Sequence, residues 1–388
     1  MISQSKSDNL CIACFISSHG FGHASRASAV MEAMLEIRPS IRFEIFSAVP
    51  QWFFQQLFSG SFTYHNLLTD IGLIQETPLR EDLPKTLQSL NNFLPFDHFQ
   101  ITNIAEQINR MRCQLVICDI APMGIMVAQT ANIPSVLVEN FTWDWIYEGY
   151  ACPDFPVDNH IEYLQRIFKS ANYHIQTEPV CNYYRNAYLI TQPISRKTRT
   201  LPQQVRQRLG IPENVKLIMI TMGGIPEEYI FLNQLTQMND IYFVIPGSGQ
   251  SIQRLDNTVL LPHCSDFFHQ DLVNACDVVI GKLGYSTLSE VYNAGVPYGY
   301  ITRSNFRESK TINIFVKKQM NGCAISEKQF QDGSWISFIP DLIAFPRKQP
   351  DNTNGAIHAA QFICKVLNGD NPLSQNQKIS QTEHLIIE

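Results

Sequence analysis

The chain has 388 residues, more than one ordinary hydrophobic core accommodates, so two domains are expected. Hydrophobic residues make up 45% and charged residues 16% of it, which is typical of a globular protein and excludes a fibrous or disordered chain. The net charge of −6, without a long run of Lys or Arg, argues against a nucleic-acid-binding protein.

The sequence shows no sign of a membrane span or a secretory leader. No stretch reaches the roughly 18 apolar residues that cross a bilayer, and the polar start 1–10 lacks a signal-peptide pattern. A cytoplasmic location is therefore expected, with peripheral membrane association left open. Cys11 and Cys14 form a C-x-x-C pair in a predicted strand, where they face opposite sides, so neither a redox nor a zinc site is expected.

The N-terminal half alternates apolar strand-like runs with helical patterns, as in a parallel sheet covered by helices. The predicted strands are Cys11–Ser17, Arg42–Ser47, Gln114–Cys118, Ser135–Val138 and His174–Thr177. The predicted helices are Ala24–Ile37, Gly124–Ala131 and Ile161–Ser170. An irregular aromatic-rich stretch occupies 141–157.

A polar, proline-bearing segment at 191–200 is the best candidate for a linker, because the alternation begins again after it. The later strands are predicted at Lys216–Thr221, Tyr242–Ile245, Val259–Leu261, Asp277–Ile280 and Tyr298–Ile301, and the helices at Asp271–Cys276, Ser286–Ala294, Asn305–Gln319 and Gly355–Leu367. We therefore predict an α/β fold with domains 1–190 and 201–367, a linker 191–200, a flexible tail 368–388 and a ligand cleft between the domains.

A glycine-containing turn follows the strand that ends at Ile280. Ser286 or Thr287 can cap the helix after it, and a helix start offers unpaired N–H groups and a positive dipole end to a diphosphate. Gly281 and Gly284 would let the backbone approach such a ligand. The spacing does not fit a P-loop. An ordinary capped strand-to-helix turn is the alternative interpretation.

A second glycine-containing loop, residues 17–26, follows the first strand and contains His19 and His23. Ligands of open α/β sheets bind beyond the carboxyl ends of strands, and an imidazole there can act as a general base. The loop does not match the dinucleotide fingerprint, and the second strand lacks an acid at its end. Catalysis is thus favoured over cofactor binding.

The stretch Gly284–Pro297 resembles the C-terminal nucleotide-sugar motif of GT-B glycosyltransferases, G-x-x-T-x-x-E-x-x-x-x-G-x-P, and is most similar to the family-28 kind that includes the bacterial lipid II N-acetylglucosaminyltransferase. The resemblance implies two Rossmann-like domains facing across a cleft, with the diphosphate at the turn and Glu290 on the ribose. Glu308, in a segment similar to the one that reads the donor sugar, is a sugar-hydroxyl candidate. The alternatives are a solvated helix charge for Glu290 and a surface charge for Arg303.

The loop 17–26 resembles the G-H motif that opens the acceptor domain of many GT-B enzymes. The resemblance implies that His23 takes the proton from the acceptor hydroxyl and that Asp119 orients it, since a carboxylate behind an imidazole fixes its tautomer. The alternative for Asp119 is a helix cap before Pro122. His19, which has no counterpart in most of the superfamily, is either the base itself or a sugar or phosphate contact.

Residues 140–147, together with 18–26, 118–122 and 281–282, resemble the non-kinase N-terminal half of plant arabinokinases and related bacterial predicted glycosyltransferases. The likeness runs to about residue 365, and the sugar-kinase half is absent, so it implies no kinase activity. Lys282 fits this subgroup and would bring positive charge to a phosphate. We expect Trp143 or Asp144 near the acceptor pocket, although aromatic residues more often line a core.

Together these features predict a glycosyltransferase that moves a sugar from a nucleoside-diphosphate sugar, expected to be UDP-linked, to an acceptor hydroxyl of a small molecule or lipid. The resemblance implies inversion, since one base suffices for direct displacement. A metal bound through a D-x-D pair is not expected because no such pair occurs, and no cofactor is expected beside the nucleotide sugar, which is a co-substrate. The alternatives are a nucleotide-sugar epimerase or hydrolase and a non-catalytic nucleotide-sugar-binding module. The candidates are His23, His19 and Asp119 for catalysis; Gly223, Gly224, His263, Gly281, Lys282, Gly284, Ser286, Thr287, Glu290, Arg303 and Glu308 for the donor; and Gly20, Phe21, Gly22, Asn140, Trp143 and Asp144 for the acceptor.

Overall fold

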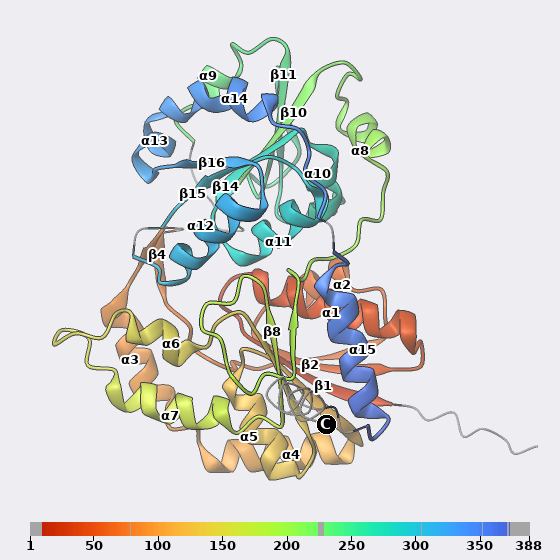
Figure 1. Ribbon diagram of the computed structural model, residues 1–388, viewed down its shortest axis with the longest axis vertical. Coiled ribbons are helices and arrows are strands. Elements are labelled where there is room, and N and C mark those ends of the chain that lie inside the picture. Colours follow the sequence, from red (N-terminus) through yellow and green to blue (C-terminus); the bar gives the residue numbers. More distant parts are fainter. Residues whose placement is uncertain are drawn as a thin grey trace, which may run out of the picture.

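The computed structural model describes residues 10–77, 79–223, 229–303, 305–350, 352–370 and 372. They form two α/β lobes, with the N-terminal lobe below and most of the C-terminal half above (Figure 1). Each lobe is built on its own sheet. This arrangement confirms the predicted α/β class with two parallel-sheet units.

The N-terminal lobe has a seven-stranded parallel sheet in the order β3-β2-β1-β6-β7-β8-β9. Its strands are β1 (Cys11–Ile16), β2 (Arg42–Ser47), β3 (Phe62–Asn66), β6 (Cys113–Asp119), β7 (Ser135–Glu139), β8 (Tyr173–Thr177) and β9 (Leu189–Thr191). Its helices are α1 (Gly22–Ile37), α2 (Gln51–Leu57), α3 (Leu83–Phe93), α4 (His98–Arg110), α5 (Pro122–Ala131), α6 (Trp143–Glu148) and α7 (Asp158–Lys169). Every residue of β1 is buried, as expected for a central strand covered on both faces.

The C-terminal lobe has a sheet in the order β12-β13-β11-β10-β14-β15-β16, parallel except for β12 at one edge. Its strands are β10 (Lys216–Thr221), β11 (Ile241–Pro246), β12 (Gln253–Leu255), β13 (Thr258–Leu261), β14 (Val278–Lys282), β15 (Tyr298–Ile301) and β16 (Gly322–Ile325). Its helices are α8 (Pro202–Leu209), α9 (Leu232–Leu235), α10 (His269–Ala275), α11 (Tyr285–Ala294), α12 (Glu308–Gln319), α13 (Glu327–Asp332), the 3-10 helix η1 (Ser334–Phe338) and α14 (Ile339–Ala344).

Both sheets have a point at which the strand order reverses. Strand β1 lies between β2 and β6, and β10 lies between β11 and β14. In open α/β sheets, ligands bind beyond the carboxyl ends of the strands at such a point. Because α1 contacts α11, the reversal points of the two lobes face each other.

The last helix, α15 (Gly355–Leu367), crosses back to the lower lobe and lies beside α1 (Figure 1). Its buried residues Ala359, Ala360 and Ile363 belong to the N-terminal core. The sequence interpretation had included 355–367 in the C-terminal unit, because an apolar helix face shows that a partner exists but not which one. The boundaries 1–190, 191–200 and 201–367 otherwise stay a prediction, and most of the tail 368–388 lies outside the described residues.

A β-hairpin from the lower lobe reaches the upper lobe. Its strands, β4 (Gln75–Thr77) and β5 (Arg80–Glu81), pair in antiparallel fashion, and β4 lies near α12 (Figure 1). Between them Leu79 joins the apolar core of the C-terminal lobe. The hairpin therefore connects the two lobes on the side away from the linker.

Two further sequence expectations concern the cysteines and the membrane. Cys11 and Cys14 face opposite sides of the N-terminal sheet, as predicted, because they belong to different core clusters. Within the described ranges no helix is both long and apolar enough to cross a bilayer.

Candidate functional site

The structure brings His23 and Asp119 together at the carboxyl end of the N-terminal sheet. His23 lies in the first turn of α1, and Asp119 is the last residue of β6. Because β1 and β6 are parallel neighbours, with Ile16 in register with Asp119, the chain leaving β1 passes the end of β6. His23 Nδ1 lies 2.9 Å from Asp119 Oδ1. The helix cap of α5 is Ala121, so capping by Asp119, the alternative interpretation, is wrong.

Arg26, one turn further along α1, binds the same carboxylate. Its Nε donates to Asp119 Oδ2 at 2.8 Å, and its Nη2 donates to Oδ1 at 2.6 Å. Burial alone would raise the pKa of Asp119, but the charge of Arg26 and the hydrogen bond to His23 lower it. Asp119 is therefore held ionised. No role for Arg26 is predicted from the sequence, although its i+3 spacing from His23 puts both side chains on one helix face.

The two histidines have opposite hydrogen-bonding character. Burial lowers the pKa of His23, with Asp119 opposing the shift, so its imidazole is neutral near pH 7. With its Nδ1–H directed to Asp119, its Nε2 carries a free lone pair. His19 Nδ1 instead accepts from Leu73 N–H at 3.3 Å, and burial keeps its pKa well below the ordinary value. The neutral imidazole of His19 therefore carries its proton on Nε2, as a donor.

The first turns of α1 and α11 meet across the cleft. A Cβ added to Gly22 would lie 3.3 Å from Ser286 Cβ. Neither helix has a side-chain cap or an acidic residue in its first turn, so capping by Ser286 or Thr287, which the sequence predicted, is wrong. Both hydroxyl residues lie inside the first turn of α11. Two sets of unpaired N–H groups and two positive dipole ends thus converge.

A cavity of about 380 Å³ opens at this junction, within the range of small-molecule sites. Both lobes and the linker form its walls. Of the predicted residues, Phe21, Gly22, Gly223, His263, Ser286 and Thr287 line it. The lining residues that the sequence did not predict include Trp52, Phe53, Arg196, Arg199, Arg208, Phe268 and His269.

The cavity wall carries three arginines, of which Arg196 and Arg199 are ion-paired with Glu290 and Glu32. Its arginines, Arg196, Arg199 and Arg208, outnumber its acids, Asp266 and Asp271. The guanidinium carbons of Arg196 and Arg199 lie 4.6 and 4.1 Å from the ring centre of Phe268. Asp271 accepts a hydrogen bond from the Arg199 backbone at 2.7 Å, so one of the two acids is already engaged. Such a wall favours an anionic ligand with a planar or apolar part.

Glu290 lies buried behind this wall, 1% exposed, and is therefore not the solvated charge of the alternative interpretation. Arg196 donates to Oε1 through Nε, at 3.0 Å, and through Nη2. His269 Nδ1 lies 2.6 Å from Oε2. Burial alone would raise the pKa of Glu290, but Arg196 and His269 lower it to about 2. Protein groups engage both carboxylate oxygens, and the ribose role of Glu290 stays a prediction.

A polar chain connects His23 and Asp119 to the predicted sugar-reading residues. Arg26 Nη1 donates to Asn140 Oδ1 at 2.8 Å, and Asn140 Nδ2 donates to Glu308 Oε1 at 2.7 Å. Asn140 thus joins the lobes instead of lining the cavity. Arg303 is 6% exposed, with its guanidinium carbon 3.7 Å from the ring centre of Phe306, so the alternative of a surface charge is wrong.

No family model of known proteins matches the chain. The chain is 22% identical over 361 residues to the L-arabinokinase of Arabidopsis thaliana. The matched region makes up 92% of this chain but only 34% of that protein. The chain therefore spans about a third of the length of this curated relative.

Solved structures with low sequence identity share the fold. The calicheamicin glycosyltransferase matches with a TM-score of 0.61 at 12% identity, over 92% of this chain and 98% of that one. Arabidopsis thaliana UGT89C1, complexed with UDP, matches with a TM-score of 0.57 at 10% identity, over 94% and 96%. A putative UDP-N-acetylglucosamine 2-epimerase from Listeria monocytogenes gives 0.52 at 11%, over 94% and 98%. The chain has the GT-B fold.

The predicted glycines differ in what their missing side chain allows. A Cβ on Gly281 would lie 2.4 Å from Thr221 O, so this glycine lets β14 pack closely against β10. Gly20 and Gly223 have positive φ, +73° and +76°. The position of a Cβ on Gly223 is 3.5 Å from Lys282 Cε, so the lysine lies beside this glycine. A Cβ on Gly284 would meet nothing within 4 Å, and Gly224 lies outside the described residues.

Trp143 and Asp144, predicted near the acceptor, are buried and do not line the cavity, and Trp143 lies beside His19. The ring centre of Trp143 lies 5.1 Å from that of His19. The indole N–H and Asp144 Oδ1 are buried polar atoms without a hydrogen-bond partner in the described part of the chain. Burial raises the pKa of Asp144. Trp143 therefore lies close enough to His19 to shape a second ligand's site.

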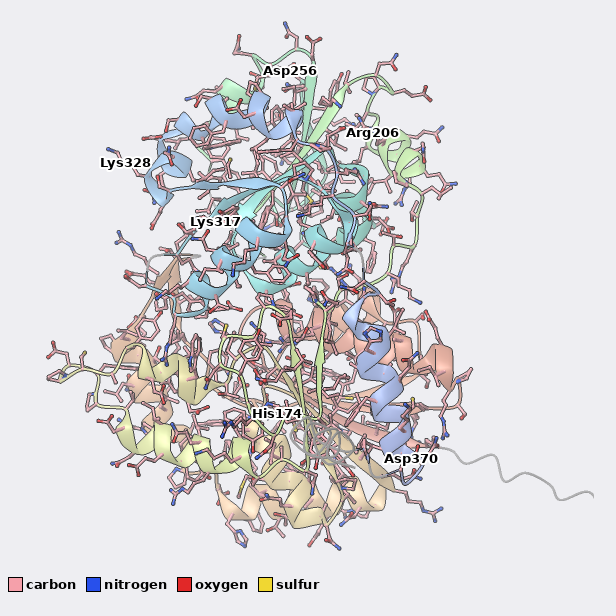
Figure 2. The ribbon with its side chains drawn as sticks, viewed as in Figure 1. His174, Arg206, Asp256, Lys317, Lys328 and Asp370 are labelled. Atoms are coloured by element: carbon pink, nitrogen blue, oxygen red, sulfur yellow. The ribbon has the colours of Figure 1, made fainter. Side chains whose placement is uncertain are left out.

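A further histidine–glutamate pair is buried in the lower lobe. Figure 2 shows His174 within the lower lobe, where its Nε2 lies 2.7 Å from Glu139 Oε1. Over the described ranges, no group of three or more His, Cys, Asp or Glu side chains is arranged to hold a metal ion.

Proposed function

We propose that this chain is a glycosyltransferase that moves a sugar from a UDP-linked donor to an acceptor hydroxyl, without a metal and with inversion. One observation carries the proposal: a His23–Asp119 pair, 2.9 Å apart, lies in the same cleft as two converging helix starts and a cavity with arginines in its wall. The His23–Asp119 pair suits proton transfer. The two helix starts and the arginine-bearing cavity suit a nucleoside diphosphate.

The donor diphosphate binds at the start of α11, where the N–H groups and the hydroxyls of Ser286 and Thr287 donate to its oxygens. Lys282 adds positive charge there, and Gly223, Gly224 and His263 border it. The nucleoside occupies the cavity beside Phe268, with Glu290 on its ribose. UDP is the expected nucleotide because UGT89C1, which shares the fold, was solved with UDP.

His23 acts as the base. Its Nε2 takes the proton of the acceptor hydroxyl while that oxygen attacks C1 of the sugar, opposite the diphosphate. The bond from C1 to the diphosphate oxygen breaks, and the negative charge that develops on the leaving group is stabilised by the helix starts and Lys282. Ionised Asp119 stabilises the imidazolium that forms. A single displacement inverts the configuration at C1.

The hydrogen-bonding pattern favours His23 over His19 as the base. The proton of neutral His19 is on Nε2, because its Nδ1 accepts from Leu73 N–H. His19 therefore donates to an oxygen of the donor sugar or of the acceptor. Phe21, Gly22, Trp143 and Asp144 border the acceptor, a small molecule or lipid that bears a hydroxyl.

Ligand-induced stabilisation tests the donor site. We expect UDP to raise the melting temperature, because a ligand at 100 times its Kd stabilises by about 2.7 kcal/mol. ADP, GDP and dTDP serve as matched nucleotides. If no nucleoside diphosphate raises the melting temperature, the proposed donor site is wrong.

Turnover of UDP-sugars by the wild-type chain and by His23→Gln tests the chemistry. The variant is expected to bind UDP as the wild type does, while transfer falls about 10²- to 10⁴-fold. Undiminished transfer would rule out His23 as the base. An epimerised sugar, or free sugar formed whether or not an acceptor is present, would indicate an epimerase or a hydrolase. Binding without any turnover would indicate a binding module.

A further inference from the structure

Two cysteine thiols are in contact at the start of two neighbouring inner strands of the N-terminal sheet. Cys11 is the first residue of β1, and Cys113 is the first residue of β6. Their sulfur atoms lie 3.4 Å apart, so one thiol donates a hydrogen bond to the other. Both cysteines are free. Cys14, the other member of the C-x-x-C pattern, faces the opposite side of the sheet, so the contact is independent of that pattern.

An irregularity of the β1–β6 ladder brings the two thiols together. Ile12 is in register with Leu115, so a regular parallel ladder would place Gln114 opposite Cys11. The register shifts by one residue there, and Cys113 takes that place. Paired residues of neighbouring strands lie about 4.8 Å apart, within the range of roughly 4.4–6.8 Å between the Cα atoms of a disulfide. Side-chain rotation can therefore form a bond without separating the strands.

A charged side chain activates one of the two thiols. Arg42 Nη2 donates to Cys11 Sγ at 3.4 Å. The hydrogen bond from Cys113 and the guanidinium of Arg42 lower the pKa of Cys11, against the effects of burial and of the charge of Glu44. Because the thiolate is the nucleophilic form of a cysteine, Cys11 is the reactive member of the pair.

Cys113 has the opposite character, which suits it to a second step. The same hydrogen bond to Cys11 raises the pKa of Cys113, and burial adds to the shift, so Cys113 keeps its proton while Cys11 is ionised. Cys14 and Cys118 lie on the same two strands, and burial raises the pKa of both. The pair thus places an activated thiolate beside a protonated thiol, as in an attacking and a resolving cysteine.

The pair lies just beneath the surface of the sheet edge. The thiols belong to residues that are 3% and 5% exposed. The Arg42 side chain that contacts Cys11 is 51% exposed, and Arg112 and Gln114, on either side of Cys113, are exposed as well. An oxidant as small and uncharged as hydrogen peroxide therefore needs only the displacement of an exposed side chain to reach Cys11.

We infer that Cys11 and Cys113 form an oxidisable thiol pair, which hydrogen peroxide converts into a disulfide between β1 and β6. The Cys11 thiolate attacks one peroxide oxygen, the O–O bond breaks, and the departing hydroxide takes up a proton and leaves as water. Cys11 is then a sulfenic acid. The sulfur of Cys113 attacks Cys11 Sγ, the S–O bond breaks, and the hydroxyl leaves as a second water with the thiol proton. Two electrons pass from the two thiols to one peroxide.

This modification site does not rest on the proposed transfer reaction. Cys11 and Cys113 lie at the amino ends of β1 and β6, whereas His23 follows β1 and Asp119 ends β6. The disulfide would join positions 102 residues apart and so restrict the unfolded chain. Its expected consequence is a more stable N-terminal lobe, with the residues of the candidate site untouched.

The test treats the full-length chain with hydrogen peroxide, blocks the remaining thiols, and maps the digested chain without reductant by mass spectrometry. The variants are Cys11→Ala, Cys113→Ala and Arg42→Gln. Cys14→Ala is the matched control, because Cys14 lies on the same strand as Cys11 and is also buried. Melting temperatures of the untreated variants verify folding.

We expect a linked pair of peptides that contain Cys11 and Cys113, lighter by two hydrogen atoms than the separate peptides. It should form in the wild type and in Cys14→Ala, be absent from Cys11→Ala and Cys113→Ala, and disappear with dithiothreitol. Arg42→Gln should form it about 10-fold more slowly, because less of Cys11 is ionised. The oxidised wild type should melt about 5 °C or more above the reduced chain.

The exposed cysteines Cys152 and Cys264 report whether the dose of peroxide is sufficient. If they are oxidised while Cys11 and Cys113 stay unlinked in the wild type, the inference is wrong, and this result does not depend on the folding of any variant. A bond from Cys11 to another cysteine, equal rates in Arg42→Gln and the wild type, or a linked chain that melts no higher than the reduced one would also overturn it.

Discussion

Each lobe holds a buried carboxylate between an arginine and a histidine. In the N-terminal lobe, Asp119 accepts from Arg26 Nε at 2.8 Å and lies 2.9 Å from His23 Nδ1. In the C-terminal lobe, Glu290 accepts from Arg196 Nε at 3.0 Å and lies 2.6 Å from His269 Nδ1. The pKa of both carboxylates is lowered by these partners against the effect of burial.

The origins of the partners differ between the two clusters. Arg26 and His23 come from one helix, α1, so the N-terminal cluster is preorganised within its own lobe. Arg196 comes from the segment between the lobes, so the C-terminal cluster ties that segment to α10 and α11. The same charge pattern thus suits proton transfer in one lobe and fixation of a binding wall in the other.

Replacing each carboxylate by its amide is expected to give the largest difference in kinetic constants between the two clusters. We expect Asp119→Asn to lower kcat by about 10³- to 10⁴-fold, because an amide neither fixes the tautomer of His23 nor stabilises its imidazolium. Glu290→Gln should instead raise the KM for the donor and change kcat less than about 10-fold. Steady-state kinetics with the preferred UDP-sugar distinguish the two.

A third cluster provides the control for these variants. Glu44 on β2 lies 3.3 Å from Arg42 Nε and 2.8 Å from His65 Nε2, away from the cavity wall. Glu44→Gln should leave both kinetic constants near the wild-type values. If Glu290→Gln lowers kcat as much as Asp119→Asn does, the division of roles between the lobes is wrong.

The pH dependence of the free energy of unfolding tests the C-terminal cluster, with a smaller expected effect. The pKa of Glu290 is about 2 in the folded chain, below its ordinary value of 4.5. Its ionised form therefore stabilises the fold above pH 4.5, by about 3 kcal/mol, and this contribution is lost as the pH falls toward 2. Glu290→Gln should lower the free energy of unfolding at pH 7 and flatten its decline between pH 5 and 3, as measured by urea titration. If the decline of the free energy of unfolding between pH 5 and 3 is unchanged in Glu290→Gln, Arg196 and His269 do not stabilise the ionised carboxylate of Glu290.

The central parts of the fold were predictable from the sequence because they are buried on both faces. Strand β1 is a continuous apolar run and β10 is one after Lys216, and the structure places both within a residue of the predicted ranges. The hairpin β4–β5 was missed, since its strands are very short and contain polar residues. The helices α3 and α4 were also missed, although Asp82 and Asp97 before them are recognisable caps.

The site was predictable only where its residues follow strand ends. His23 lies in the first turn after β1 and Asp119 is the last residue of β6, at the same edge of one sheet, and this topology brings them together. The pairing of Arg196 with Glu290 joins residues 94 positions apart through packing of the linker segment against α11, which no local pattern encodes.

The pH dependence of turnover gives the finest test of the N-terminal cluster. Because burial lowers the pKa of His23, the acidic limb of kcat/KM should lie below pH 6.5. The charge of Arg26 also lowers this pKa. Removing that charge in Arg26→Gln should therefore move the limb to higher pH, by less than about one unit, whereas Arg26→Lys should leave it near its wild-type position. A limb that moves to lower pH in Arg26→Gln, or does not move, would show that Arg26 does not act on the base through its charge.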